Sequence, residues 1–481
     1  MINIKAIANI KESFKTRQVK YGGYAALLTL AVIAALLFLN LMAGQFPLQV
    51  DLTESKLYSL SEQTLQVLDQ IKTPVKFYGL WRPGEENQDV ITVVNLCLSR
   101  NKNVSMDVID PDRNPGFVIR YDRERQGIAR GSLIVEGEKG FRIISPRDMY
   151  DYLQTQSGMG VSGVAVEQRI LSALIFASSG YTPVIYEITG HEEDLLSEHN
   201  LQDMVERENF TLKTLNLQVS AIPSDASVLV INNPQKDLSS GEAEKLLNYL
   251  ENGGRLLVLA DYSIRSLTGL NEVLASYGLQ FMYGIVRETD PNYIAFDFRS
   301  IWPDIFDHEI TKPLMDKNKT PVILLESMPL SILETRRRTI QVSPLMASSP
   351  NAFLRTDLEE DSADKKPSDI SGLQIFGAAA ADPSWVQDDE KQTRIVAIGC
   401  GSLLPIYTFL GFEANRDLFM NSLTWLEDRP GTISVRSKSI LQMPMRLNMT
   451  QIIIFGTLFI FVIPVGFFVT GLVTWLKRRH L

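Results

Sequence analysis

The stretch SVLVINNPQKDLSSGEAEKLLNYLENGGRLLVLAD, residues 227–261, decides the fold. It begins with an apolar strand that ends at Asn232-Asn-Pro234, and a helix follows from Leu238 to Glu251. Asn252-Gly-Gly254 then predicts a left-handed helix end, and residues 255–261 form a second apolar strand. Strands that are apolar throughout, with a helix between them, are typical of a parallel sheet covered on both faces.

The same alternation continues on both sides of this stretch. Further strands and helices are predicted at residues 183–191, 194–208, 211–215, 374–381, 394–398 and 415–426. The basic run Arg336–Arg338 is expected on a solvated face, and the segment Asp357–Asp369 is expected to be an exposed loop. We therefore predict one Rossmann-like α/β domain with inserted loops over residues 183–428.

Another domain is predicted before it, over residues 51–157. A strand, a helix and a strand are expected, followed by a hairpin and a final helix, at residues 75–81, 89–100, 104–109, 132–144 and 147–154. This order resembles a thioredoxin-like domain. The redox cysteines are absent from the first strand-to-helix turn, Gly79–Gly84, so we expect no thiol chemistry. Residues 158–182 are expected to form an interdomain loop followed by a helix.

Two segments without charged residues, 21–44 and 447–476, are each long enough to cross about 30 Å of hydrocarbon as a helix. Basic residues lie beyond them in the tails 1–20 and 477–481, so the positive-inside rule places both termini in the cytoplasm. The region between the spans is then extracytoplasmic, with residues 429–446 as the linker to the second span. We expect a protein of the inner or plasma membrane of a bacterium.

Charge excludes one class of partner. Residues 51–446 contain 39 basic and 55 acidic side chains, a net charge of −16, in a chain whose net charge is −9. A region this acidic repels nucleic acid, so we expect no nucleic-acid partner. The basic tails are the parts of the chain expected to meet anionic membrane lipid.

Motifs for chemistry are few. Gly158-Met-Gly-Val-Ser-Gly163 matches a dinucleotide-binding pattern, with Glu187 as a possible ribose partner, but a predicted helix precedes the glycines where that pattern needs a strand. No Walker A, HExxH or GxSxG motif occurs in the sequence. We therefore predict no catalytic residue, no cofactor and no metal, and expect that the chain is not an enzyme.

The histidines and cysteines are the remaining candidates. His191, Glu192 and His199 could converge on a metal ion, but an acidic run up to Asp194 is also what a helix N-terminus favours. Cys97 and Cys400 could form one disulfide if the region is extracytoplasmic. Two unpaired, buried cysteines are the favoured alternative.

The stretch DLTESKLYSLS, residues 51–61, marks the point where the chain leaves the membrane. Ser59-Leu-Ser-Glu62 predicts a capping box at the start of a helix, which Pro74 stops. The stretch is also a candidate interface for a membrane partner, because a tyrosine at a membrane boundary places its ring among apolar groups and its hydroxyl in the interface. The candidate interface residues are Asp51, Thr53, Lys56, Tyr58, Ser59 and Ser61.

Residues 51–81, DLTESKLYSLSEQTLQVLDQIKTPVKFYGLW, resemble the opening of the GldG-like family of gliding-motility-associated auxiliary subunits of ABC-2-type transporters. Later stretches are similar to the same family, at Ile188–Glu192, Leu238–Asp261, Leu274–Leu279, Gly399–Ser402 and Asn415–Trp425. Glu192 stands where the family has glycine. The resemblance implies a second domain similar to the amidotransferase scaffold and to a domain of intraflagellar-transport subunits, without amidotransferase catalysis.

The resemblance implies a non-catalytic, membrane-anchored auxiliary subunit that could also bind substrate. Its expected partners are an ABC-2-type permease, the cytoplasmic ATPase of that permease, and membrane lipid. A stand-alone cell-surface binding protein for a polysaccharide or a lipid-linked ligand is the alternative. A membrane-tethered hydrolase would need a catalytic constellation that the sequence does not show.

Overall fold

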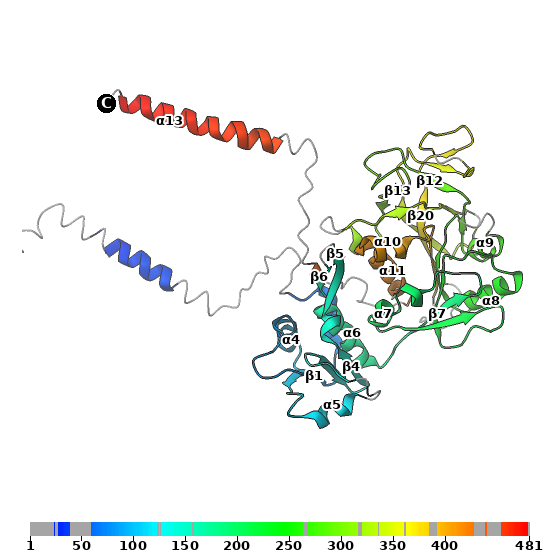
Figure 1. Cartoon of the computed structure of the whole chain (residues 1–481), viewed down its shortest axis with the longest axis horizontal. Coiled ribbons are helices and arrows are strands. Elements are labelled where there is room, and N and C mark those ends of the chain that lie inside the picture. The colour runs from blue at the N-terminus through cyan, green and yellow to red at the C-terminus, as the bar shows by residue number, and fades with distance from the viewer. Residues whose placement is uncertain are drawn as a thin grey trace, which may run out of the picture. The chain divides into compact units, whose positions relative to one another are not determined.

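The computed structural model describes residues 24, 27–38, 59–122, 125, 127–155, 158–199, 201–262, 267–315, 320–334, 336–359, 362–383, 392–427, 438–439 and 454–479 (Figure 1). The chain divides into two units, Met1–Tyr58 and Ser59–Leu481. All strands in the described residues belong to the second unit. Their sheets contain parallel and antiparallel pairs, which confirms the predicted α/β class.

A four-stranded sheet in the order β2-β1-β3-β4 begins the second unit. β1 and β2 are parallel, whereas the β1–β3 and β3–β4 pairs are antiparallel. The elements are α3 (Glu62–Gln70), β1 (Val75–Gly79), α4 (Gln88–Arg100), β2 (Val104–Val108), α5 (Pro115–Tyr121), β3 (Leu133–Gly137) and β4 (Gly140–Ile144). The predicted strand-helix-strand unit and hairpin are confirmed. The thioredoxin-like assignment stays a prediction.

One apolar core lies beneath the helices of this sheet. Val90, Val94 and Cys97 follow one another at spacings of four and three residues on α4. They pack on β1 with Leu68 of α3 and Leu174 of α6 (Val166–Ser179). The long apolar helix predicted after the glycine motif is therefore confirmed as α6. The spacing of three and four residues on α4 is what turns one face of a helix toward a core.

The helix predicted over residues 147–154 is wrong. A short 3₁₀ turn, η1 (Pro146–Met149), leads instead into strand β5 (Tyr150–Thr155), which pairs with β6 (Gly158–Val164) as an antiparallel hairpin. The sheet order is β22-β6-β5, because β22 (Lys438–Ser439) pairs with the end of β6. The predicted interdomain loop at residues 158–163 is thus a strand, which its glycines concealed because glycine usually weakens strands.

A larger sheet follows in the order β11-β16-β20-β21-β10-β9-β7-β8. Its parallel half consists of β7 (Val184–Thr189), β8 (Thr211–Asn216), β9 (Ala226–Asn232), β10 (Arg255–Leu259) and β21 (Thr393–Ile398). The strands predicted around residues 227–261 are therefore confirmed. The helix predicted over residues 194–208 is shorter, with a 3₁₀ turn η2 (Leu196–His199) and then α7 (Leu201–Glu206).

The other half of this sheet corrects the prediction of a purely parallel sheet. β20 runs antiparallel to β21, and the strands beyond it are antiparallel as well. These strands are β11 (Leu279–Phe281), β14 (Asp304–Ile305), β16 (Leu330–Ile332), β17 (Gln341–Ala347) and β20 (Ile375–Asp382). Short strands β12 (Ile285–Arg287), β13 (Ser300–Ile301), β15 (Leu324–Leu325), β18 (Phe353–Arg355) and β19 (Ile370–Ser371) form two further small sheets.

Both faces of the large sheet are buried. On β10, Leu256 and Val258 belong to one core, and Leu257 and Leu259 belong to the other. Alternate side chains of a strand point to opposite faces, so this pattern places helices on both sides. α8 (Ser240–Glu251) and α9 (Thr268–Ala275) cover one face, and α7, α10 (Leu403–Leu410) and α11 (Glu413–Leu426) cover the other (Figure 1).

The predicted exposed loop Asp357–Asp369 is anchored by a buried ion pair. Arg355 of β18 is fully buried, and its Nη2 lies 2.9 Å from Asp369 Oδ2. Its guanidinium also donates to the carbonyl oxygens of Ser362 at 2.6 Å and Asp364 at 2.5 Å. The predicted solvated face at Arg336–Arg338 is likewise only partly right, because Arg337 pairs with the fully buried Asp382 at 3.3 Å.

One helix of the described residues, Ile454–Leu476, is long and apolar enough to cross a membrane, with a mean hydropathy of 2.2. It contains a π-helical turn at Leu458–Val462 before α13 (Ile463–Arg479). Pro464 cannot donate a backbone hydrogen bond, and a π turn just before it accommodates that loss. A shorter apolar helix, Leu27–Phe38, lies within the first predicted span, whose remaining residues are mostly outside the described ones.

Candidate functional site

Only part of the membrane-proximal stretch is described. Asp51, Thr53, Lys56 and Tyr58 lie outside the described residues, and Ser59 and Ser61 lie inside them, half-buried. Helix α3 begins at Glu62 with Ser61 as its N-cap, and Ser61 Oγ accepts a hydrogen bond from Thr64 N at 3.2 Å. The predicted capping box, with Ser59 as the cap and Glu62 as its return partner, is therefore wrong in detail.

Glu167, in the first turn of α6, replaces Glu62 as the return partner. Its Oε1 accepts hydrogen bonds from Ser61 N at 2.6 Å and from Thr64 Oγ1 at 2.7 Å, and the residue is 3% exposed. A carboxylate that accepts two buried hydrogen bonds holds its donors firmly in place. The start of α3 is thus tied to the start of α6, which sequence spacing could not reveal.

Ligands of open α/β sheets usually bind beyond the carboxyl ends of the parallel strands. At this edge, His191 follows β7 and is 2% exposed. Its Nδ1 lies 2.9 Å from Glu193 Oε1, and its Nε2 lies 3.1 Å from Glu242 Oε1. Glu242 belongs to the capping box that Ser239 forms at the start of α8. His191 therefore links the end of β7 to the start of α8.

The chemistry of this group follows from its partners. Ionised carboxylates only accept hydrogen bonds, so both ring nitrogens of His191 must donate, which is possible only for the imidazolium. The hydrogen bond with Glu193 raises the pKa of His191 above its ordinary value of 6.5, although burial acts in the opposite direction. Because both ring nitrogens of the charged His191 donate to carboxylates, the residue stabilises the turn and is not available as a base or as a metal ligand.

Neighbouring residues at the same edge of the sheet are also occupied by contacts within the fold. Asn233 Nδ2 donates to Asp194 Oδ2 at 2.7 Å, and a Cβ at Gly401 would lie 2.3 Å from Asn233 Oδ1. A Cβ at Gly399 would lie 1.8 Å from the carbonyl oxygen of Met328. The two glycines around Cys400 are therefore required by close packing. Burial raises the pKa of the Cys400 thiol, so at neutral pH it is not a thiolate nucleophile.

Both cysteines are free and buried, which confirms the favoured alternative of two unpaired thiols. Cys97 packs in the core of the four-stranded sheet, and burial raises its pKa to about 12. Glu187, the possible ribose partner, is fully buried within β7, and its Oε1 accepts a hydrogen bond from Leu196 N at 2.5 Å. In the described residues, no group of three or more His, Cys, Asp or Glu side chains is arranged to hold a metal ion.

Glu192, at the position where the GldG-like family has glycine, adopts a left-handed conformation with φ of 60°. Glycine takes this conformation without steric cost, whereas glutamate does so rarely. Its carboxylate pairs with Lys236 Nζ at 2.6 Å on the surface. Glu192 thus adopts a conformation that glycine would take more easily, and its side chain is held by an exposed ion pair.

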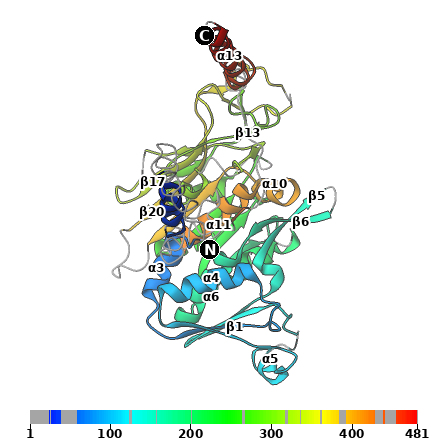
Figure 2. The same cartoon turned by 90° about the vertical axis from the view of Figure 1, so that its left-hand side faces the viewer.

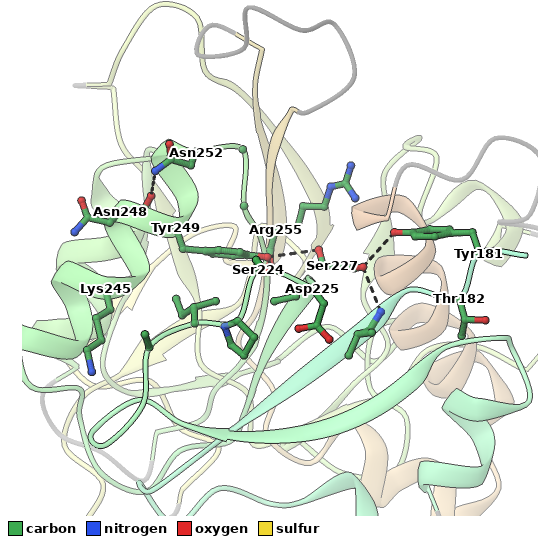
Figure 3. Close-up of a pocket in the computed structure, with 17 residues that line it drawn as sticks. Tyr181, Thr182, Ser224, Asp225, Ser227, Lys245, Asn248, Tyr249, Asn252 and Arg255 are labelled. Atoms are coloured by element: carbon green, nitrogen blue, oxygen red, sulfur yellow. Dashed lines mark hydrogen bonds between the residues drawn. The ribbon is translucent and has the colours of Figure 1, made fainter.

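At the opposite, amino-terminal edge of the parallel strands lies a groove of about 700 Å³, named here the amino-edge groove (Figure 3). Hydroxyl, amide and tyrosine side chains line it, among them Tyr181, Ser224, Asn248, Tyr249 and Asn252. Its charged side chains have partners: Asp225 pairs with Lys213 at 2.9 Å, Arg255 pairs with Glu427 at 3.4 Å, and Lys245 donates to the carbonyl oxygen of Leu217 at 2.5 Å. The charged side chains of this groove are therefore occupied by contacts within the fold.

Ion pairs join the hairpin and α6 to the large sheet. Arg416 of α11 is 8% exposed and contacts Asp417 Oδ1 at 3.0 Å and Asp151 Oδ2 of β5 at 3.1 Å. Arg169 of α6 lies 3.3 Å from Glu208. The pairs Arg416–Asp151 and Arg169–Glu208 were not predicted, because their members are far apart along the chain.

His191→Gln is expected to lower the free energy of unfolding by about 1.5–3 kcal/mol near pH 6, because hydrogen bonds between charged, buried groups are lost. The folded-state pKa of His191 lies above 6.5, so its contribution is fully present below that pH and is lost as the pH rises through the folded-state pKa. The difference between the wild type and the variant, measured by urea unfolding of the detergent-solubilised chain, should therefore shrink in alkali.

His308→Gln is the control for that experiment. Burial lowers the pKa of His308 below 6.5, so any contribution from this residue is present above that pH and is lost as the pH falls. The two variants should therefore show opposite pH trends. A His191→Gln difference that stays constant from pH 6 to pH 9 would contradict the charged state assigned here.

Residues 182–399 match a family described as an ABC-type uncharacterized transport system. The match, which covers less than half of the chain, supports an auxiliary component of such a system. Together with the apolar helix Ile454–Leu476, it indicates that the protein associates with a membrane. No curated protein matches the chain.

Some solved structures are similar to parts of the chain. The mmIFT52 N-terminal domain has 16% identity and a TM-score of 0.37, over 51% of this chain and 98% of that one. Exo-beta-1,4-mannosidase Op5Man5 from Opitutaceae bacterium strain TAV5 has 10% identity and a TM-score of 0.29, over 71% and 48%. Cytoplasmic Protein STM3548 from Salmonella typhimurium has 9% identity and a TM-score of 0.25, over 49% and 98%. These scores are too low to support an argument about function.

Proposed function

We propose that this chain is a GldG-like, membrane-anchored auxiliary subunit of an ABC-2-type transport system, acting beside a separate permease and a separate cytoplasmic ATPase. The family match over residues 182–399 is the observation that carries the proposal. The carboxyl edge of the large sheet supports a non-catalytic role, because its histidine, its acidic residues and Cys400 are occupied by internal contacts. Binding or coupling is then the task left to the extramembrane region.

The proposed topology has two spans, both termini in the cytoplasm, and residues 51–446 outside the inner or plasma membrane of a bacterium. Ile454–Leu476 supports the second span by length and composition. The basic tails support the orientation and offer contacts to anionic lipid. Within the extracytoplasmic region, we propose a thioredoxin-like domain before residue 158 and a Rossmann-like domain over residues 183–428.

A second candidate function is supported by the amino-edge groove. A stand-alone surface protein that captures a polysaccharide or a lipid-linked ligand would need a hollow with hydroxyl, amide and aromatic groups, and this groove supplies them. Its internally paired charges favour a neutral ligand over an anionic one. The two functions differ in whether a permease accompanies the chain.

Lys56→Ala combined with Tyr58→Ala is expected to reduce recovery of the permease with the tagged chain after mild detergent extraction. The reason is that these side chains lie in the proposed interface at the membrane surface, where a tyrosine ring and a lysine can contact the partner. The measurement is quantitative mass spectrometry of the purified complex. The control, Lys102→Ala combined with Tyr293→Ala, removes the same two residue types elsewhere and should leave recovery unchanged.

Two outcomes would redirect the proposal. Unchanged permease recovery with the Lys56 and Tyr58 variant, at normal expression, would remove this stretch from the interface. A wild-type chain that is recovered without any permease or ATPase, but with a bound polysaccharide, would instead favour the second candidate function.

A further inference from the structure

Both ends of the described extramembrane fold form hydrogen bonds close to the start of α6. The N-terminal end is held where Ser61 N donates to Glu167 Oε1 in the first turn of α6. The C-terminal end is held where Lys438 and Ser439 pair with Val164 and Gly163, just before α6 begins. The two parts of the chain that lead to the proposed spans, before Ser61 and after Ser439, therefore join the fold within a few residues of the start of α6.

The direction of β22 shows where the chain leaves the fold toward the second proposed span. Because β22 is antiparallel to β6, the chain passing from Lys438 to Ser439 runs along β6 toward the tip of the β5–β6 hairpin. The apolar helix Ile454–Leu476 begins 15 residues after Ser439. An extended chain of that length spans at most about 50 Å, so the start of the helix lies within that distance of Ser439, which is beside the β5–β6 hairpin.

Apolar side chains are exposed on the β5–β6 hairpin and at the end of α10. Tyr152 and Val161 are direct cross-strand partners on the hairpin, 40% and 39% exposed. Phe409 and Leu410, in the last turn of α10, are 76% and 56% exposed.

The two apolar pairs lie near each other. The ion pair between Arg416 and Asp151 joins them, because Asp151 precedes Tyr152 and the guanidinium of Arg416 lies over the ring of Tyr407, 5.5 Å from its centre. Figure 2 and Figure 1 both show β5 and β6 beside α10.

We propose that Tyr152, Val161, Phe409 and Leu410 form a membrane-contacting surface whose occupant is the lipid interface of the bilayer. The inference rests on the proposed function only for its assignment of Ile454–Leu476 as a span. Aromatic and aliphatic side chains partition into the boundary between head groups and acyl chains, where an apolar face lies about 5–10 Å deep. A tyrosine hydroxyl can remain among the head groups.

Lipid fits this surface better than a protein partner does. A stable protein interface buries about 800 Å² on each partner, with about 20–30 residues a side. The four side chains here, two on the hairpin strands and two in the last turn of α10, are far fewer. Lipid contact needs only a few apolar groups, because the spans already hold the chain at the bilayer. The surface would then fix the tilt of the extramembrane region on the membrane.

The test uses the full chain, without permease, in nanodiscs of zwitterionic phosphatidylcholine. An environment-sensitive fluorophore is attached to Tyr152→Cys or Phe409→Cys, while the two native cysteines are buried. Ile119→Cys, at a position 71% exposed on α5, is the matched control. Lipids that carry a nitroxide quencher near the head group are then compared with unmodified lipids.

We expect a loss of fluorescence at positions 152 and 409 with the quencher lipids, and no loss at position 119. Equal signals at all three positions, in variants whose circular dichroism and melting match the wild type, would overturn the proposal. So would quenching at only one of the two positions. Quenching at both positions in a chain that never copurifies with a permease would support this inference while the proposed transport function fails.

Discussion

Arg416→Ala is expected to lower the free energy of unfolding by about 3–5 kcal/mol, because it removes a buried guanidinium that two carboxylates share. Arg416 is 8% exposed and lies 3.0 Å from Asp417 and 3.1 Å from Asp151. Since Asp151 belongs to β5 and Arg416 to α11, the variant should also weaken the connection between the hairpin and the large sheet. Urea unfolding of the detergent-solubilised chain should then show two separated transitions.

The matched control for this prediction is Arg299→Ala. Arg299 also forms an ion pair, with Asp297 at 3.0 Å, but the two side chains are 39% and 40% exposed. Exposed pairs of this kind contribute about 0–1 kcal/mol, so this variant should unfold like the wild type. If Arg416→Ala were as mild as the control, the ion pair would not join the two parts of the fold.

Arg355→Leu is the second substitution with a large expected effect, a loss of about 3–5 kcal/mol in the free energy of unfolding. It removes the guanidinium that pairs with the buried carboxylate of Asp369 and donates to two loop carbonyl oxygens. Burial acts to raise the pKa of Asp369, but the hydrogen bonds from Arg355 and from the backbone N–H of Lys366, together with the positive charges of both side chains, outweigh it, so the pKa lies below 3.8. The stabilisation is therefore present above pH 3.8 and is lost as the pH falls through the folded-state pKa. Faster amide hydrogen exchange in the segment 362–369 would measure the loss of the contacts that Arg355 makes with it.

The double substitution Arg355→Leu with Asp369→Leu separates charge from packing. Replacing both members of a buried ion pair by apolar residues is often close to neutral, so the double variant should recover much of the stability lost in the single one. A double variant that is as unstable as Arg355→Leu would show that the bonds to Ser362 and Asp364, rather than the charge pair, hold the loop.

Local patterns predicted the parts of the fold that local forces determine. The strands around residues 227–261 are apolar throughout, and the helix between them has its own cap at Ser239, so both were predicted correctly. α4 was predicted because its apolar residues recur at helical spacing. In each case the pattern that predicts the element is complete within a short stretch of sequence and needs no distant partner.

The failures involve partners that are distant in sequence. β6 is rich in glycine and is a strand because β5 and β22 pair with it on both sides. The antiparallel half of the large sheet depends on β20 pairing with β16 and β17, which loop lengths did not reveal. Arg355 was missed because its buried pair with Asp369 closes a segment whose composition is typical of a solvated loop.

The candidate sites divide in the same way. Ser61 was recognised as part of a helix start, but Glu167 as its partner comes from another helix. His191 was noticed for its residue type, and its partner Glu193 lies two residues later in the sequence. Its other partner, Glu242, belongs to α8 and becomes evident only in the fold. The amino-edge groove had no sequence signal, because most of its lining comes from loops that precede three strands and are far apart in the sequence, with the rest from those strands and α8.

The position of β22 has a consequence for biosynthesis. β6 leaves the ribosome with its edge at Gly163 and Val164 uncovered, and the strand that pairs with these two residues is not made until Lys438 and Ser439. At about 5–20 residues per second, the nascent chain carries an open strand edge for roughly tens of seconds. Open edges are templates for pairing with other chains. Products truncated before Lys438 keep that edge permanently, which makes them targets for aggregation and for proteolytic quality control.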